Sequence, residues 1–202
     1  MQTATSPLAN SRAVLLDRDG VINQPVLDAT TGQYESPYTA ADVVLVPGIV
    51  EVIRRLQDEG IALAVVSNQP AAAKGTHTLD ELLSVDEAIK ALLEHENVTL
   101  PIWHYCFHHP DGTDTTLAYT CDCRKPASGL LRAALDDLGI PATKNVWMIG
   151  DSDADIGAGN AIGVTTLLYA HPLTGHRRGM LKPSFQAASV EAIDSILIDH
   201  GI

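Results

Sequence analysis

The chain has 202 residues, of which 46% are hydrophobic and 19% are charged. That is enough to bury one substantial core and short for two, so we expect a single domain over residues 1–202. Lys and Arg number 13 against 25 Asp and Glu, and the formal charge of −12 argues against nucleic acids and anionic membranes as partners. The first dozen residues lack the features of a secretory signal and no apolar stretch approaches a membrane helix, which predicts a cytoplasmic protein, expected to be a monomer.

Apolar runs alternate with amphipathic stretches along the chain. The short aliphatic run 13–17 predicts a buried strand, and the polar segment 24–46 predicts a long loop with little regular structure. Apolar residues at helical spacing over 49–60 predict a helix that ends at a glycine. A buried strand over 61–67 and a second helix over 79–96 are expected next.

Three more strands are expected, over 102–106, 145–150 and 164–169. A helix over 128–138 lies between the first two, a short helix of small residues follows the second, and an amphipathic helix over 189–201 closes the chain. Strand and helix thus alternate five times. This pattern predicts an α/β, Rossmann-like three-layer sandwich with a mainly parallel sheet.

Cysteines and histidines gather in one short window. Its members are Cys106, Cys121 and Cys123 with His104, His108 and His109. Three cysteines cannot all pair within the chain, and their clustering favours a metal site over a disulfide framework. A CxH and a CxC pair can close a tetrahedral zinc site around a loop at about 106–123, and four protein ligands predict a structural role. The spacing leaves open whether His108 or His109 is the ligand.

Polar side chains follow the carboxyl ends of the expected strands, where parallel α/β folds bind ligands. Asp17 and Asp19 follow the first strand, Ser67 the second and Asp151 the fourth. Crowded carboxylates need a cation to stay ionised, and oxygen ligands favour Mg²⁺. A carboxylate beside Mg²⁺ can attack a phosphoryl group, which predicts Asp17 as nucleophile and Asp19 as general acid, then base. Ser67 and Lys125 are suited to stabilising that group.

Four segments, DRDG, SNQ, CRKP and GDSDAD, occur in this order. They resemble the four motifs of phosphatases of the haloacid-dehalogenase superfamily, which implies hydrolysis of phosphomonoesters through an aspartyl-phosphate intermediate. The resemblance also implies Mg²⁺ bound by the side chains of Asp17 and Asp151 and the backbone carbonyl of Asp19, with Asp155 supporting the loop. No large cap domain is expected.

The longer segments DRDGVIN, SNQPAAAKG, CFHHPDG and CDCRKP resemble a narrower branch of that superfamily. The branch contains D-glycero-D-manno-heptose 1,7-bisphosphate phosphatases and histidinol-phosphate phosphatases, and it carries an inserted zinc loop. The zinc ligands that the resemblance implies are Cys106, His108, Cys121 and Cys123. By the same resemblance Arg124 contacts a substrate phosphate and Lys125 stabilises the transferred phosphoryl group.

Other positions bear on the substrate. Asn68 and Lys74 are secondary candidates for substrate contacts. In a late polar loop His171 and His176 lie near Arg177 and Arg178. We expect a solvated surface there, with a contact to a substrate phosphate as the alternative. Ser152 stands where the heptose phosphatases of the branch carry Lys. The resemblance therefore carries over least to the loops that contact the substrate.

Two enzyme functions fit these observations. The first is removal of the 7-phosphate from a heptose 1,7-bisphosphate, and the second is the same chemistry on histidinol phosphate or another small phosphomonoester, with acidic loop residues such as Asp28 or Glu35 facing an amine. A zinc-stabilised module that binds a phosphorylated ligand without hydrolysing it is the alternative from another class. The net charge of −12 argues against a DNA-end phosphatase, because DNA would be repelled. The expected partner is a small phosphorylated metabolite, most simply a sugar bisphosphate.

Overall fold

The structure is a computed structural model that describes residues 11–202. In chain order its elements are β1 (Ala13–Leu16), β2 (Val26–Leu27), β3 (Tyr34–Glu35), the 3-10 helix η2 (Ala40–Asp42), α1 (Ile49–Asp58), β4 (Ala62–Asn68), α2 (Leu79–His95), β5 (Trp103–Cys106), α3 (Gly129–Leu138), β6 (Val146–Gly150), α4 (Asp153–Ile162), β7 (Thr165–Tyr169), the 3-10 helix η3 (Gly175–Arg177), β8 (Phe185–Ala187) and α5 (Val190–Asp199). The expectation about a secretory signal concerns mostly residues 1–10, which lie outside the described residues.

Six strands form one sheet in the order β5-β4-β1-β6-β7-β8, and all neighbours run parallel. β1 is central: Leu16 pairs with Val65 of β4 on one side and with Ile149 of β6 on the other. The strand order reverses at β1, which is the point where open parallel sheets leave a crevice beyond their carboxyl ends. The loops after β1, β4 and β6 therefore meet at one edge.

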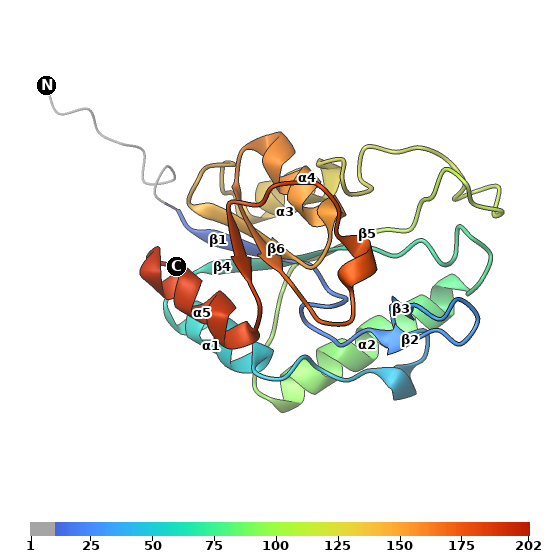
Figure 1. Ribbon diagram of the computed structural model, residues 1–202, viewed down its shortest axis with the longest axis horizontal. Coiled ribbons are helices and arrows are strands. Elements are labelled where there is room, and N and C mark those ends of the chain that lie inside the picture. The colour runs from blue at the N-terminus through green and yellow to red at the C-terminus, as the bar shows by residue number, and fades with distance from the viewer. Residues whose placement is uncertain (1–10) are drawn as a thin grey trace, which may run out of the picture.

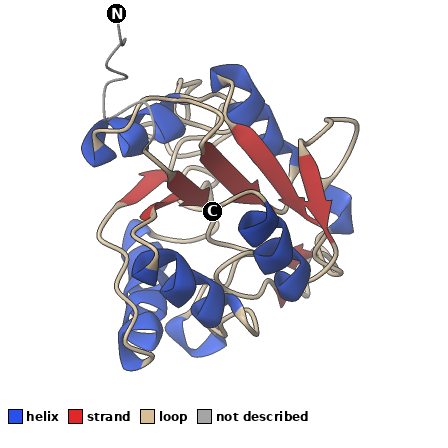
Figure 2. Ribbon diagram, turned by 90° about the vertical axis from the view of Figure 1, so that its left-hand side faces the viewer, coloured by secondary structure: helices blue, strands red, loops and turns tan. Residues whose placement is uncertain are grey.

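Helices cover both faces of the sheet (Figures 1 and 2). Because side chains alternate along a strand, Val14 and Leu16 of β1 pack with the apolar residues of α1, α2 and α5, whereas Ala13 and Leu15 pack with those of α3 and α4. The two buried clusters are the two interfaces of a three-layer sandwich. The predicted fold class is confirmed, and residues 11–202 contain no large cap domain.

Local signals set the helix ends. Thr78 precedes α2 and forms a capping box with Glu81: the Thr78 hydroxyl accepts from the Glu81 amide at 3.2 Å, and the Glu81 carboxylate accepts from the Thr78 amide at 2.7 Å. Gly60 follows α1 with φ of 71°, a conformation that favours glycine. The sequence predicted both helices within two residues of these ends.

Two parts of the fold differ from the sequence prediction. The segment 24–46 contains the antiparallel pair β2 and β3 and the turn η2, and the sheet has a sixth strand, β8. Strands of two or three residues are too short for an alternating pattern to stand out. Among residues 11–202, no helix combines the length and the apolar character needed to cross a membrane.

The packing of α3 on the sheet gives a stability prediction. Leu131 is fully buried in α3, so Leu131→Ala is expected to lower the free energy of unfolding by about 2–5 kcal/mol through lost burial and a residual cavity. Urea denaturation measures the change. Leu83→Ala, at a position in α2 that is 44% exposed, is the control and should change it by at most about 0.5 kcal/mol. Equal losses in the two variants would contradict this packing.

Candidate functional site

A cavity of about 290 Å³ opens at the carboxyl ends of β1, β4 and β6. Its lining residues are Asp17, Asp19, Glu35, Ser36, Ser67, Asn68, Pro70, Lys74, Arg124, Lys125, Asp151, Ser152, Ala154, Asp155 and Arg177. Every residue that the four motifs proposed for phosphoryl chemistry or magnesium binding lines this cavity, as do Asn68, Lys74 and Arg124, the candidates for substrate contacts. The parallel topology therefore brings the four separated motifs together.

The ammonium group of Lys125 lies buried at the centre of the site. Its Nζ is 2.9 Å from Asp17 Oδ1 and 2.6 Å from Asp155 Oδ1, and it donates to the Val66 carbonyl at 2.7 Å. Burial opposes the charged form, but the charges of Asp155 and Asp17 outweigh it and raise the pKa of Lys125. Lys125 is thus held as a cation and fixes one oxygen of the predicted nucleophile.

Three buried carboxylates crowd together beside that ammonium. Oxygens of Asp17, Asp151 and Asp155 lie within 4.8 Å of one another. Burial, followed by the charge of Asp155, raises the pKa of Asp17 to about 6, and burial, followed by the charge of Asp17, raises the pKa of Asp151 to about 8. Neither oxygen of Asp151 has a hydrogen-bond partner among the described residues. Buried carboxylate oxygens that accept no hydrogen bond fit a divalent cation with oxygen ligands, and Asp17 and Asp151 together could hold one.

Asp155 both supports the loop and begins a helix. Its Oδ2 accepts from the amide of Ser152 at 3.2 Å and from the Ser152 hydroxyl at 2.6 Å, which caps α4, while Oδ1 faces Lys125. The position before Asp151 is Gly150, where a Cβ would collide with the Asp155 carboxylate. The backbone can therefore bring Asp151 and Asp155 into one cluster only with glycine there.

Asp19 is an ionised hydrogen-bond acceptor in this arrangement. The fully buried Arg18 donates to both of its oxygens at 3.0 Å, and Asn23, Ser36 and Gln69 donate as well. Burial opposes ionisation, but the charge of Arg18 outweighs it and lowers the pKa of Asp19. These donors therefore hold Asp19 in its ionised form, and it can donate a proton only after it has taken one up.

The two polar residues after β4 have different surroundings. Ser67 is buried, and its hydroxyl accepts from Gln69 Nε2 at 2.9 Å. The Asn68 side chain accepts from the Lys125 amide at 3.0 Å and donates to the Lys125 carbonyl at 2.9 Å. Asn68 lines the cavity, but its amide group is engaged by the backbone of Lys125. Its contacts hold the CRKP segment in place.

The remaining cations of the cavity come from loops. Arg124 is half-buried and donates to the His108 carbonyl at 3.4 Å, and Lys74 is exposed at the rim. Arg177, in the segment expected to be a solvated surface, instead reaches into the cavity and contacts Asp151. His171 was also expected on that surface, and this is wrong: it is only 5% exposed because the β7–β8 connection folds back over it.

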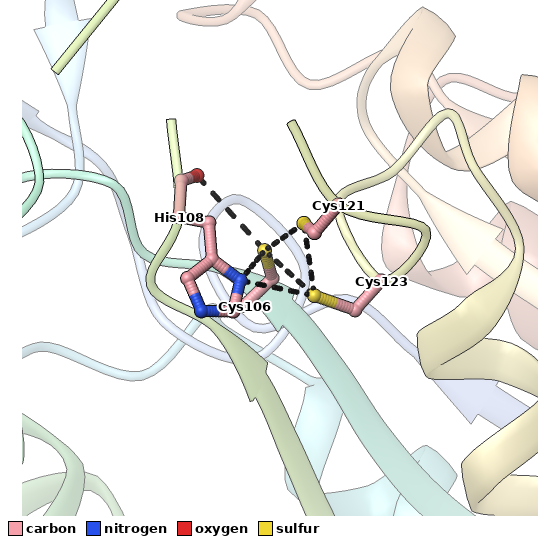
Figure 3. Close-up of side chains that lie close together, drawn as sticks. All are labelled: Cys106, His108, Cys121 and Cys123. Carbon is pink, nitrogen blue, oxygen red and sulfur yellow. Dashed lines mark hydrogen bonds between the residues drawn. The ribbon is translucent and has the colours of Figure 1, made fainter. Parts of the chain in front are cut away.

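Three cysteines and one histidine meet at one point of the loop after β5. The Cys123 sulfur is 3.0 Å from that of Cys121 and 3.2 Å from that of Cys106, and His108 Nδ1 is 3.3 Å from the Cys123 sulfur. Figure 3 shows the sulfurs and this nitrogen facing a common centre. Burial opposes ionisation of Cys121, but hydrogen bonds from Cys123 and from the Arg124 amide lower its pKa to about 7. Soft ligands in this geometry can bind a metal.

The other histidines of the window have different partners. His109 Nδ1 accepts from the Asp111 amide at 3.1 Å, outside the cluster, and His104 pairs with Asp137 at 2.9 Å. Sequence reasoning missed Tyr119, whose hydroxyl is 2.6 Å from Nε2 of His108. A partner on the outer nitrogen fixes the orientation of a metal-binding imidazole. An aromatic hydroxyl at an irregular loop position gives no sequence signal of its own.

Comparisons with known proteins identify the family of this chain. The model of the Hydrolase-like family, described as HAD-hydrolase-like, matches residues 122–193. The D-glycero-beta-D-manno-heptose-1,7-bisphosphate 7-phosphatase of Haemophilus influenzae is 31% identical over 173 residues, which cover 84% of this chain and 89% of that protein. The protein of the same name from Escherichia coli K12 is 33% identical over 154 residues, 76% of each chain.

Solved structures share the fold. The D,D-heptose 1.7-bisphosphate phosphatase from B. bronchiseptica, complexed with magnesium and phosphate, superposes with a TM-score of 0.75 at 23% identity, covering 94% of this chain and 99% of that chain. The D,D-heptose 1,7-bisphosphate phosphatase from Burkholderia thailandensis gives 0.62 at 19% identity, covering 93% and 99%. With relatives above 30% identity over three quarters of its length, the chain belongs to the haloacid-dehalogenase-like hydrolases, in the family of the D-glycero-beta-D-manno-heptose-1,7-bisphosphate 7-phosphatases.

Proposed function

We propose that this protein is a Mg²⁺-dependent phosphatase that removes the 7-phosphate of a D-glycero-D-manno-heptose 1,7-bisphosphate. The observation that supports it most is Asp17, which the buried Lys125 holds in the cavity beside the Asp151 carboxylate, neither oxygen of which has a hydrogen-bond partner among the described residues. The substrate in this proposal is taken from the names of the relatives described above. The net charge of −12 favours a dispersed, monomeric protein, and a cytoplasmic location stays a prediction of the sequence.

In the first half-reaction an oxygen of Asp17 attacks the phosphorus atom, and the bond from phosphorus to the sugar oxygen breaks. Lys125 and the Ser67 hydroxyl stabilise the negative charge of the phosphoryl oxygens. The sugar oxygen takes a proton from Asp19, which must be protonated and turned toward the cavity for this step. In the second half-reaction the ionised Asp19 accepts a proton from the water that attacks phosphorus and releases phosphate and Asp17.

Magnesium and zinc have separate places in this proposal. The side chains of Asp17 and Asp151, with the backbone carbonyl of Asp19, would hold Mg²⁺, which when bound neutralises charge on the phosphoryl oxygens. The Cys/His cluster would hold Zn²⁺ with four protein ligands and thus a structural role. The cluster bears on the cavity because Arg124 donates to the His108 carbonyl and its amide contacts the Cys121 sulfur.

One contact disfavours an amine-bearing substrate. Glu35 is the lining carboxylate that lies outside the motifs, and it pairs with Arg177 at 3.4 Å. Asp28, the other acidic loop residue considered, does not line this cavity. A cationic group on the substrate would therefore have to displace Arg177, whereas a second phosphate would meet the cations that line the cavity.

Substrate turnover tests the proposed function. Phosphate release with Mg²⁺ is measured for both anomers of heptose 1,7-bisphosphate and for histidinol phosphate. We expect a strong preference for a heptose bisphosphate and a loss of roughly 10³-fold or more in kcat for Asp17→Asn, because the nucleophile is removed. Asp58→Asn, at an exposed position of α1, is the control. Preference for histidinol phosphate would refute the substrate, activity surviving Asp17→Asn would refute the nucleophile, and binding without release would indicate a binding module.

The raised pKa values predict how magnesium stabilises the fold. Asp17 and Asp151 titrate near 6 and 8 in the folded protein and near 3.8 when unperturbed, so the folded state binds more protons than the unfolded state between these values. The free energy of unfolding without Mg²⁺ therefore falls as the pH rises from about 5 to about 8. Urea denaturation at both pH values should show Mg²⁺ stabilising the protein more at the higher pH, and Asp151→Asn should reduce that difference. Equal stabilisation at both values would count against this site.

The Tyr119 contact gives a prediction for zinc. Tyr119→Phe keeps the ring beside His108 but removes the hydroxyl that contacts Nε2, so the affinity for Zn²⁺ is expected to fall about 10- to 100-fold. Competition with a chromophoric chelator measures it. Tyr169→Phe, in β7 and outside the loop, is the matched control. A Tyr119→Phe affinity equal to that of the control would contradict the assigned geometry.

A further inference from the structure

Arg177 connects parts of the cavity wall that are far apart in the chain. Its guanidinium donates from Nη2 to the Tyr34 carbonyl at 3.1 Å, lies 3.4 Å from Glu35 Oε2, and places Nη1 3.5 Å from Asp151 Oδ2. The side chain is only 17% exposed. Arg177 is therefore fixed against β3 at one end and faces the carboxylate cluster at the other.

Of the three contacts of Arg177, the one with Asp151 is the contact that a bound cation could replace. At 3.5 Å it is an ion pair without a good hydrogen bond. A divalent cation at Asp17 and Asp151 would satisfy Asp151 and repel a guanidinium, while the contacts with Tyr34 and Glu35 would persist. Nη1 would then be a donor that points into the cavity without a partner.

The other buried cation of the site is already engaged. Lys125 holds Asp17, Asp155 and the Val66 carbonyl, so it serves the end of the cavity where the phosphoryl group is transferred. Arg177 is anchored instead to β3, through the Tyr34 carbonyl and through Glu35, which lines the cavity. An arginine fork fixed at a wall is suited to an anionic oxygen on the part of the substrate that leaves.

We propose that Arg177 is a specificity-determining residue that binds the phosphate of the substrate that is not transferred. This inference rests on the proposed function, since it requires a substrate with two phosphates. It assigns the segments 24–46 and 171–178 a shared role: together they form the wall that distinguishes a bisphosphate from a monophosphate.

The test compares two substrates that differ only in that phosphate. For heptose 1,7-bisphosphate and heptose 7-phosphate, kcat/KM is measured in the wild type, Arg177→Ala, Arg177→Lys and the control Arg178→Ala, whose guanidinium contacts the His171 carbonyl outside the cavity. We expect Arg177→Ala to lower kcat/KM for the bisphosphate about 10- to 100-fold, mainly through KM, as for a lost hydrogen bond to a charged group. The monophosphate should change less than about threefold, and Arg177→Lys should recover part of the loss.

Other outcomes overturn the inference. Equal losses of kcat/KM on both substrates would place Arg177 at the metal or at the transferred phosphoryl group. A kcat/KM for the bisphosphate equal to that of the wild type would show that Arg177 takes no part in recognition. A wild type that does not prefer the bisphosphate would refute the proposed function itself, independently of the variants. Calorimetric affinities for both ligands in the Asp17→Asn background give the same ratio without turnover, so a protein that hydrolyses neither ligand still yields a result.

Discussion

The buried ammonium group of Lys125 is the interaction on which the site depends. It joins Asp17 after β1, the Val66 carbonyl within β4 and Asp155 at the start of α4, while its own backbone is held by Asn68. Burying one charge is costly unless partners surround it. Because Lys125 has two carboxylates and a carbonyl within 3 Å, three ends of the sheet can meet at one point.

One ammonium does not balance the carboxylates around it. Asp151 remains buried with neither oxygen hydrogen-bonded among the described residues, and the pKa values of Asp17 and Asp151 are raised. The cluster therefore favours uptake of a proton or a divalent cation. Hard oxygen ligands gather at the strand ends, and soft sulfur ligands gather in the loop after β5. This separation fits a catalytic metal at the first group and a structural metal at the second.

Much of the fold and the site could be predicted from sequence because the signals are local. Five strands, five helices and the positions of Asp17, Ser67 and Asp151 at strand ends follow from short apolar runs and the residues after them. The choice of His108 over His109 came from resemblance, and the contacts agree with it.

The parts that the sequence did not reveal depend on contacts between distant segments. Arg177 meets Glu35 across 142 positions, and nothing in the composition of either polar loop indicates that they touch. His171 has the composition of a surface loop and is buried by its neighbours. Asn68 follows a strand as a ligand-binding residue would, yet its side chain is engaged by the Lys125 backbone. Contacts of this kind between distant side chains leave no periodic pattern in the sequence from which they could be predicted.

Chemical trapping of the covalent intermediate tests the central claim most directly. Rapid acid quench during turnover of heptose 1,7-bisphosphate, followed by borohydride reduction and peptide mass spectrometry, converts an acyl phosphate into an alcohol at the modified residue. The account predicts homoserine at position 17, where Lys125 holds the carboxylate, and an unmodified Asp19. Reduction at Asp19 instead, or rapid phosphate release with no reduced residue, would contradict it.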